Sequence, residues 1–423
     1  MSQNPIARSN RTGRWIALLA TLVALAALST GVSLGWKAEE IVKEGVVHVH
    51  NPESSKQRPT TIKLEETWRL GGEDDEEIFG VITDIIADDD GNFYMLDSQL
   101  NEIKVYSSDG EYLRTIGREG EGPGEFRGAF NMFLVPGGNI GVLQAFPDKV
   151  VVLTPDGDPA DDFPLPEVEG GGFRVLFSAQ SAGDNLALVY GLNQPSESGF
   201  TQTSVLSLVG ADQKESRLHS QDSRMEAASA LIAEKEWDSF RNGRWAAASD
   251  GRAFACTDFG EYKINVWDAS GKLERVIHRE YPDHRRTDEE KQQLLDIYKG
   301  FTKRIPIPDI KFEIEETHNQ IQGLFARDDG NLWVQSSRGA NGLDEGVAGI
   351  FDVYDKKGQF VKQVTLEGEG DPKNDGYFFV KDRLFVVTDW LAAMMALQGG
   401  GSDAEDAEEE PELMEIISYR IAS

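Results

Sequence analysis

The amino-acid sequence predicts an all-β protein, a six-bladed β-propeller whose last blade is shared between the two ends of the chain. Three observations carry this prediction. Pairs of glycine-bearing turns recur along the chain, and short apolar segments with an alternating pattern flank each turn. The last unit of the repeat lacks one strand, and a strand-like segment without another partner precedes the first unit.

The glycine-bearing turns come in pairs, at a similar spacing in three units and with longer inner loops in two others. Gly91 precedes Gly110 by 19 residues in the first unit, and Gly138 precedes Gly157 by 19 in the second. Glycine and asparagine tolerate the positive φ that tight hairpin turns require, so these positions predict antiparallel hairpins. Four strands in each unit of about 45 residues are typical of propeller blades.

The repeat predicts six blades within residues 60–423, which start near residues 81, 129, 173, 244, 321 and 377. The last unit shows only three strands. We expect the strand at residues 62–70 to supply the fourth, in a Velcro-type closure, because both open sheet edges then pair with each other.

The first 36 residues have the pattern of an export signal. Arg8, Arg11 and Arg14 precede an uncharged apolar stretch over residues 15–36. Two outcomes stay open: cleavage near Ala27–Ser29, which would release the protein into the periplasm, or an uncleaved signal-anchor. The length of the stretch, long enough to span a bilayer as a transmembrane helix, favours the anchor. Either outcome places the body in the cell envelope, on the extracytoplasmic side.

Two helical insertions and a linker complete the predicted organisation. Residues 37–59 have no strong pattern and are predicted to be a linker or stalk. The first helix is predicted at Met225–Trp237. The second, at Lys291–Phe301, follows a capping box made by Thr287 and Glu290.

Charge and cysteine content exclude several functions. The chain has 73 acidic and 42 basic residues, for a formal net charge of −31. Such a surface repels phosphate backbones and anionic lipid headgroups, so we expect no nucleic-acid partner. Cys256 is the one cysteine, which excludes an intrachain disulfide and a cysteine-based zinc site.

The most distinctive motif is the glycine-rich run Gly117–Phe126. A phosphate cradle would need a following Lys-Ser/Thr and a βαβ context, and this run has neither. It follows a blade's outermost strand, where the chain crosses back to the centre of the ring. We therefore interpret it as a structural crossing between blades.

The Gly-Pro-Gly-Glu-Phe crossing at residues 122–126 and the Asp-Gly-Asn turns resemble bacterial exported six-bladed propellers of the NHL-like type. The segment Asn319–Val334, which ends Asp-Gly-Asn-Leu-Trp-Val, shares this resemblance. It covers roughly residues 60–422 and concerns the fold, because a fold alone does not carry a function.

Metal sites known in such propellers were compared with this sequence. Amidating lyases of the group hold zinc with histidines near the axis, but no histidine here lies in a predicted inner strand, and His48 and His50 fall in the predicted stalk. Lactonase-type propellers hold an axial calcium with Glu, Asn and Asp. Asp84 and Asn131 are the candidates for such an axial ligand pair, although a matching glutamate does not stand out.

Calcium has a second set of candidates in the turns Asp88–Asn92 and Asp328–Asn331. They look like fragments of a calcium loop but lack the downstream glutamate. We therefore interpret them as residues that favour the hairpin turns. No cofactor is predicted, and calcium is the one ion that is kept as a candidate.

The loops at one end of the ring are the predicted functional face, because loops carry function in repeat folds. Four arginines near blade starts or hairpins are the candidates for an anion-accepting mouth: Arg127, Arg174, Arg244 and Arg338. Tyr262 and Trp390 are the aromatic candidates, and Trp390 begins an apolar stretch that runs into the acidic residues 403–410.

The sequence thus favours a non-catalytic extracytoplasmic scaffold or binding module that docks an envelope protein, peptide or glycan on this face. The alternative is a metal-dependent hydrolase or lyase, lactonase-like, with an axial site. A purely structural role stays open as a third possibility.

Overall fold

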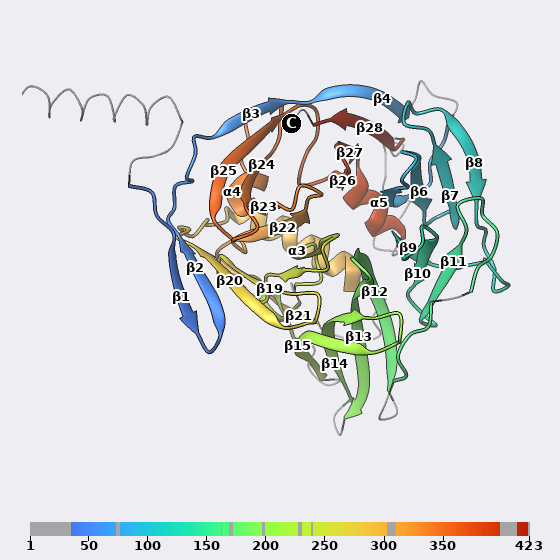
Figure 1. The fold of residues 1–423 in the computed structure, drawn as a ribbon, viewed down its shortest axis with the longest axis horizontal. Helices are drawn as coiled ribbons and strands as arrows, with labels where there is room; N and C mark the ends of the chain where they lie inside the picture. The colour runs from blue at the N-terminus through green and yellow to red at the C-terminus, as the bar shows by residue number, and fades with distance from the viewer. Residues whose placement is uncertain are drawn as a thin grey trace, which may run out of the picture.

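The computed structural model describes residues 35–72, 77–161, 163–168, 172–196, 199–226, 231–237, 240–302, 310–397 and 413–421. These residues form six sheets arranged as blades around a ring (Figure 1), and two of the sheets also contain a parallel pair. The predicted all-β, six-bladed propeller is therefore confirmed. Only two residues of the predicted export segment, 35 and 36, lie within the described ranges. Within those ranges, no helix is long and apolar enough to cross a membrane.

The first three blades follow one another along the chain. Blade 1 consists of β5 (Ile82–Ala87), β6 (Phe93–Asp97), β7 (Glu102–Tyr106) and β8 (Tyr112–Ile116). Blade 2 has three strands: β9 (Ala129–Leu134), β10 (Ile140–Gln144) and β11 (Lys149–Leu153). Blade 3 has the longest strands: β12 (Phe173–Ala182), β13 (Asn185–Ser196), β14 (Gly199–Val209) and β15 (Glu215–Glu226).

Each of the last three blades pairs with a strand from the N-terminal part of the chain. Blade 4 contains β17 (Trp245–Ala247), β18 (Ala253–Ala255), β19 (Lys263–Trp267) and β20 (Leu273–Arg279). Blade 5 contains β22 (Ile321–Ala326), β23 (Leu332–Ser336), β24 (Val347–Tyr354) and β25 (Phe360–Glu367). Blade 6 contains β26 (Gly376–Val380), β27 (Arg383–Val387), β28 (Glu415–Arg420) and β4 (Glu65–Gly71).

Residues 39–71 form what we call the N-terminal strap, which passes along the outside of blades 4, 5 and 6 (Figure 1). The hairpin of β1 (Glu39–Lys43) and β2 (Val46–Asn51) adds to the edge of blade 4, where β2 runs parallel to β20. Next, β3 (Thr60–Lys63) pairs in parallel with β25. The prediction of a linker at residues 37–59 is therefore wrong, since pairing with a strand more than 200 residues away leaves no local pattern.

The ring closes through β4, which pairs antiparallel with β28. The strand predicted at residues 62–70 is divided in the structure. Its first residues belong to β3 on blade 5, and Leu64, which is buried, separates them from β4 in blade 6.

The helices differ in part from the prediction. The second one forms as α3 (Asp288–Thr302), and its capping box is present: the Thr287 amide donates to Glu290 Oε2 at 2.9 Å. The helix predicted at Met225–Trp237 is wrong at residues 225–226 and 231–233, which are strand, and among the described residues it is present only at 234–237. Strand β15 extends to Glu226, and β16 (Leu231–Ala233) pairs with β21 (Lys311–Glu313) before the four-residue α2 (Glu234–Trp237).

Two further short helices lie in hairpin connections between second and third strands of blades. They are α4 (Ser337–Ala340) in blade 5 and α5 (Trp390–Leu397) in blade 6. The acidic run at residues 403–410 lies outside the described residues.

The hydrophobic core is divided into six clusters, and each cluster is formed by two neighbouring blades. The cluster between blades 6 and 1, for example, joins Phe385 and Ile416 to Phe93 and Met95. Because a blade buries its apolar faces only against its neighbours, every blade depends on a closed ring.

Removing β4 should therefore destabilise the whole ring. We expect a chain that begins at residue 73 to lose cooperative unfolding or to melt lower by about 10 °C or more, because blades 6 and 1 then lose part of their shared core. Thermal unfolding followed by circular dichroism measures this effect.

A chain that begins at Glu65 is the matched control. It lacks β1, β2 and β3 but keeps β4, so its ring should stay closed and its unfolding cooperative. Identical melting curves for the two truncated chains would contradict the closing role of β4.

Candidate functional site

The insertions gather at one end of the ring. In each blade the second strand ends beside the start of the innermost strand, as the pairings of Ile82 with Asp97 and of Gly376 with Val387 show. The segments that connect neighbouring blades, and those between second and third strands, therefore share one end, which we call the loop end. It carries α2, α3, α4 and α5. In Figure 1, α3 and α5 are drawn inside the ring, and they contact each other.

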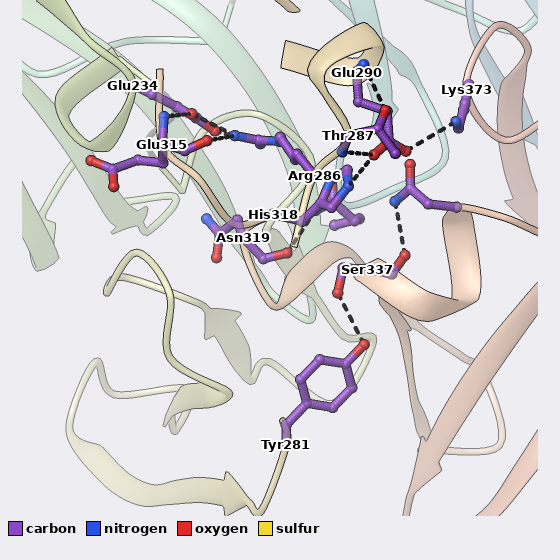
Figure 2. Close-up of polar contacts among 12 residues, drawn as sticks. Glu234, Tyr281, Arg286, Thr287, Glu290, Glu315, His318, Asn319, Ser337 and Lys373 are labelled. Atoms are coloured by element: carbon purple, nitrogen blue, oxygen red, sulfur yellow. Dashed lines mark hydrogen bonds and ion pairs between the residues drawn. The ribbon is translucent and has the colours of Figure 1, made fainter. Parts of the chain in front are cut away.

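A buried ion pair fixes the insertion that contains α3. Arg286 donates to both carboxylate oxygens of Glu234, at 2.6 and 2.7 Å, and Glu234 also accepts from the Glu315 amide at 2.8 Å (Figure 2). The exposed fractions of the two side chains are only 7% and 1%. A bidentate pair with this geometry joins the two insertions that flank blade 4.

A second set of polar contacts, around Glu290, holds the start of α3 in place. His318 Nε2 lies 3.4 Å from Glu290 Oε2, and Lys373 from the next connection lies 3.5 Å from Glu290 Oε1 (Figure 2). Burial, and then the nearby charge of Arg286, lower the pKa of His318 to about 4. His318 is therefore neutral at pH 7, and its ring contributes hydrogen bonding to the structure.

On the other side of His318, the Tyr281 hydroxyl lies 3.0 Å from Ser337 Oγ (Figure 2). Ser337 is buried, and its amide donates to the Gln320 carbonyl. These contacts link the α3 insertion to α4 of blade 5. The polar network around α3 thus holds a rigid cover at the loop end.

The predicted axial residues form a contact between blades. Asn131 Nδ2 donates to Asp84 Oδ2 at 2.7 Å, and Asn131 Oδ1 accepts from the Ala179 amide at 2.7 Å. Asp84 also accepts from the amides of Met132 and Ile85. The pair therefore joins blades 1, 2 and 3, and its ligand atoms are occupied by these hydrogen bonds.

The four predicted arginines lie at the loop end but are not brought together. Arg174 is buried and pairs with Asp148 at 2.6 Å, beside a cleft of about 560 Å³ between blades 2 and 3. Arg127 is exposed and pairs with Glu121. Arg338 contacts the Pro282 carbonyl and the Tyr281 ring.

The fourth arginine, Arg244, is buried at the start of β17 beside Cys256, whose thiol pKa is raised by burial to about 11. Since each guanidinium has its own surroundings, the predicted anion-accepting mouth does not form.

The predicted aromatic residues belong to the core. The Tyr262 hydroxyl donates to the buried Asp352 at 2.7 Å, where Arg279 also binds. The Trp390 indole donates to the Ile82 carbonyl at 3.0 Å and packs on the cluster of blades 6 and 1.

A feature that the sequence did not reveal is the placement of exposed apolar side chains. Of the ten large apolar side chains that are exposed among the described residues, seven lie at the loop end: Ile78, Leu100, Phe146, Phe173, Leu231, Leu397 and Leu413. Phe146 and Phe173 pack edge to face, with ring centroids 5.7 Å apart. Helix α5 consists wholly of apolar residues: Trp390, Ala393 and Met394 are half-buried against the core of blades 6 and 1, whereas Ala392, Ala396 and Leu397 are exposed.

The strap creates a second polar cluster, at the outer edge of blade 4 near the end of β20. His48 and His50 of β2 lie beside His278 of β20, and one ligand atom from each lies within 4.8 Å of the others. Burial and the two neighbouring imidazoles lower the pKa of His278 to about 4. His48 and His50 fall in the stalk that the sequence predicts, and only the pairing of β2 with β20 brings them beside His278.

The remaining motifs have local roles. Asp88 accepts hydrogen bonds from the amide and side chain of Asn92 and from the Tyr94 hydroxyl, as turn chemistry requires. In the glycine-rich crossing, Gly117 has a φ of 73°, and a Cβ there would lie 2.6 Å from the Phe126 ring.

The pKa of Asp84 provides a test of its role between blades. Burial raises this pKa to about 7. The folded chain therefore holds the proton more tightly than the unfolded chain, whose aspartates titrate near about 4. The stability that this proton contributes is complete below about pH 4 and is lost as the pH rises through about 7.

Asp84→Asn removes this titration. We expect the melting temperature of the variant, relative to the wild type, to rise between pH 5 and pH 8. Asp89→Asn, on the exposed turn, is the control and should show a constant difference. A constant difference for Asp84→Asn as well would show that the carboxyl is not held in its protonated form.

Breaking the buried ion pair should loosen the α3 insertion. Arg286→Met leaves the Glu234 carboxylate buried without its cation, which costs about 3–5 kcal/mol at such sites. Hydrogen exchange should then speed up across α3. Glu234→Gln combined with Arg286→Met should recover most of the protection, and Lys214→Met, at an exposed pair, should change nothing. If the single and double variants exchange equally, the pair does not hold α3.

Comparison with known proteins agrees with this architecture. Residues 72–163, which cover blades 1 and 2, match the DUF5128 family, described as a 6-bladed beta-propeller. No curated protein matches the chain. A Bacteroides fragilis protein described as exported shares 14% identity, covering 88% of this chain and all of that one, with a TM-score of 0.43.

Two other solved structures show the same level of likeness. A DUF4221 family member from Bacteroides vulgatus has 11% identity and a TM-score of 0.46, covering 86% of this chain and 99% of that one. A streptogramin B lyase has 10% identity and a TM-score of 0.39, covering 84% and 97%. At these identities and TM-scores no function carries over from these proteins. The chain is thus a six-bladed propeller whose activity must be argued from its own surface.

Proposed function

We propose that this protein is a binding module that docks a polypeptide at the loop end of the propeller. The observation that carries the proposal is the gathering of seven of the ten exposed large apolar side chains at this end. These side chains come from connections around most of the ring, and apolar surface exposed at one end of a protein is suited to binding a partner.

The chemistry of the partner follows from charge and apolarity together. The apolar surface of α5 belongs to a chain with a net charge of −31, and the acidic residues 403–410 follow it in sequence. A basic segment with apolar side chains would satisfy both features: its cations would be attracted to the acidic surface, and its apolar side chains would cover α5.

The rigidity of the loop end supports binding as well. The Arg286–Glu234 pair and the Glu290 group fix the cover around α3, so its surface needs little ordering when a partner docks. The cleft of about 560 Å³ between blades 2 and 3 adds a concave surface at the same end.

An axial hydrolase or lyase is the less favoured function. Its candidate ligands, Asp84 and Asn131, are engaged with each other and with backbone amides of three blades. Calcium at this pair would have to replace those hydrogen bonds.

The location of the module follows the sequence prediction. We propose that it acts on the extracytoplasmic side of the envelope, held there by the apolar stretch that ends at Trp36. The Trp36 indole donates to the Ser54 carbonyl at 2.8 Å, and its ring packs on the core of blades 4 and 5. A membrane segment that ends at Trp36 would therefore join the propeller without a long flexible linker.

Selection from a displayed library of random peptides tests the docking proposal. We expect enriched sequences to combine lysine or arginine with apolar residues, and their binding to weaken as salt increases. The double variant Ala392→Arg/Leu397→Arg should abolish this binding by placing cations on exposed positions of α5.

Leu113→Arg is the matched control, because Leu113 is equally apolar and exposed but lies on β8, away from the connections at the loop end. Enrichment of acidic peptides, or binding that the α5 variant leaves unchanged, would contradict the proposal.

A further inference from the structure

We propose that His48, His50 and His278 form a binding site for a divalent transition-metal ion at the outer edge of blade 4. The site lies on the outermost strands of blade 4 and does not depend on the docking function. It exists because β2 adds to β20 in parallel, with His50 directly opposite His278. His48 lies two residues before His50, so all three imidazoles project from the same face of the sheet.

The spacing of the imidazoles suits a single ion. His48 Nδ1 and His278 Nε2 are 3.1 Å apart, and one ligand atom from each histidine lies within 4.8 Å of the other two. Two nitrogens bound to zinc at about 2.0–2.1 Å in a tetrahedron lie about 3.3 Å apart. The pair is close to this spacing already. The third ring needs only a change of side-chain rotation, since it lies on the same sheet face at a half-buried position.

The three rings are stacked nearly parallel, so their side chains have to rotate before the in-plane lone pairs can meet at one ion. The His50 and His278 ring centroids are 4.4 Å apart with an interplanar angle of 4°, and His48 and His278 are 5.4 Å apart at 14°. His50 Nε2 is buried and has no hydrogen-bond partner among the described residues. A buried ring nitrogen without a partner is costly, and a metal ion would use its lone pair.

The ligand type selects the ion. Imidazole suits zinc, copper and nickel, whereas magnesium and calcium prefer oxygen ligands. A fourth donor is available in Glu39, which pairs opposite His50 across the β1–β2 hairpin and is exposed.

Two cations oppose binding and set a limit on affinity. Lys263 lies opposite His278 on β19, but its charge is paired with Asp258 at 2.9 Å. Lys43 ends β1 and lies on the exposed hairpin. We therefore expect zinc to bind more weakly here than at closed structural sites made of thiolates.

A bound ion would act as a staple. It would join β2 to β20 across 230 residues of sequence and fix the start of the N-terminal strap to blade 4. Because the site exists only when the hairpin is docked, metal binding would stabilise the docked strap.

Zinc titration of the full-length chain tests the site. After treatment with a chelator and dialysis, we expect calorimetry to show one zinc bound per chain, and metal analysis to agree, with no binding of magnesium or calcium. His50→Gln and His278→Gln should each weaken zinc binding at least about 100-fold, since even an outer partner of a ligand costs about 10- to 100-fold. Circular dichroism of both variants confirms that they fold.

His284→Gln is the matched control, because it removes a histidine from the loop end and should leave zinc binding unchanged. Zinc should also slow tryptic cleavage after Lys43 in the wild type and not in His50→Gln. The proposal is wrong if the wild type binds no zinc, if the His50 and His278 variants keep it, or if His284→Gln loses it.

Discussion

The antiparallel pairing of β4 with β28 is the interaction on which the rest of the structure depends. It joins residues 65–71 to the last strand of the chain and so completes blade 6. Each hydrophobic cluster lies between two blades, and the cluster of blades 6 and 1, against which Trp68 and Leu70 of β4 pack, depends directly on this closure. Arg69 of β4 reinforces the junction through ion pairs with Glu66, Glu369 and Glu415, although these pairs are partly exposed and contribute less than the core.

The strap explains how the sheet edges are protected. An open outer strand offers unpaired amides and carbonyls to other chains. β2 covers the edge of blade 4, and β3 covers part of the edge of blade 5 before the chain turns into β4. The same arrangement creates the histidine cluster, because it places β2 beside β20. A segment that closes the ring thus also brings together the chain's one group of three histidines found within the described residues.

The polar residues of the ring divide into two kinds. Those near the axis, such as Asp84 and Asn131, use their hydrogen-bonding capacity to join blades. Those at the loop end, such as Arg286 and Glu234, fix the insertions to the scaffold. These polar groups are engaged in contacts that hold the structure together. We therefore assign binding to the exposed apolar side chains of the loop end, which include those of α5.

The sequence by itself determined the repeat. Glycine turns and alternating strands are local features, and they predicted six blades, the closing strand near residues 62–70 and the capped helix at α3. Local patterns did not reveal the strap, because β2 and β20 pair across more than 200 residues and neither shows its partner. For the same reason His48 and His50 were assigned to a linker, and four separate arginines were grouped into one mouth. Which side chains meet depends on how blades, edges and insertions pack in space, so the candidate sites were decided by the tertiary structure alone.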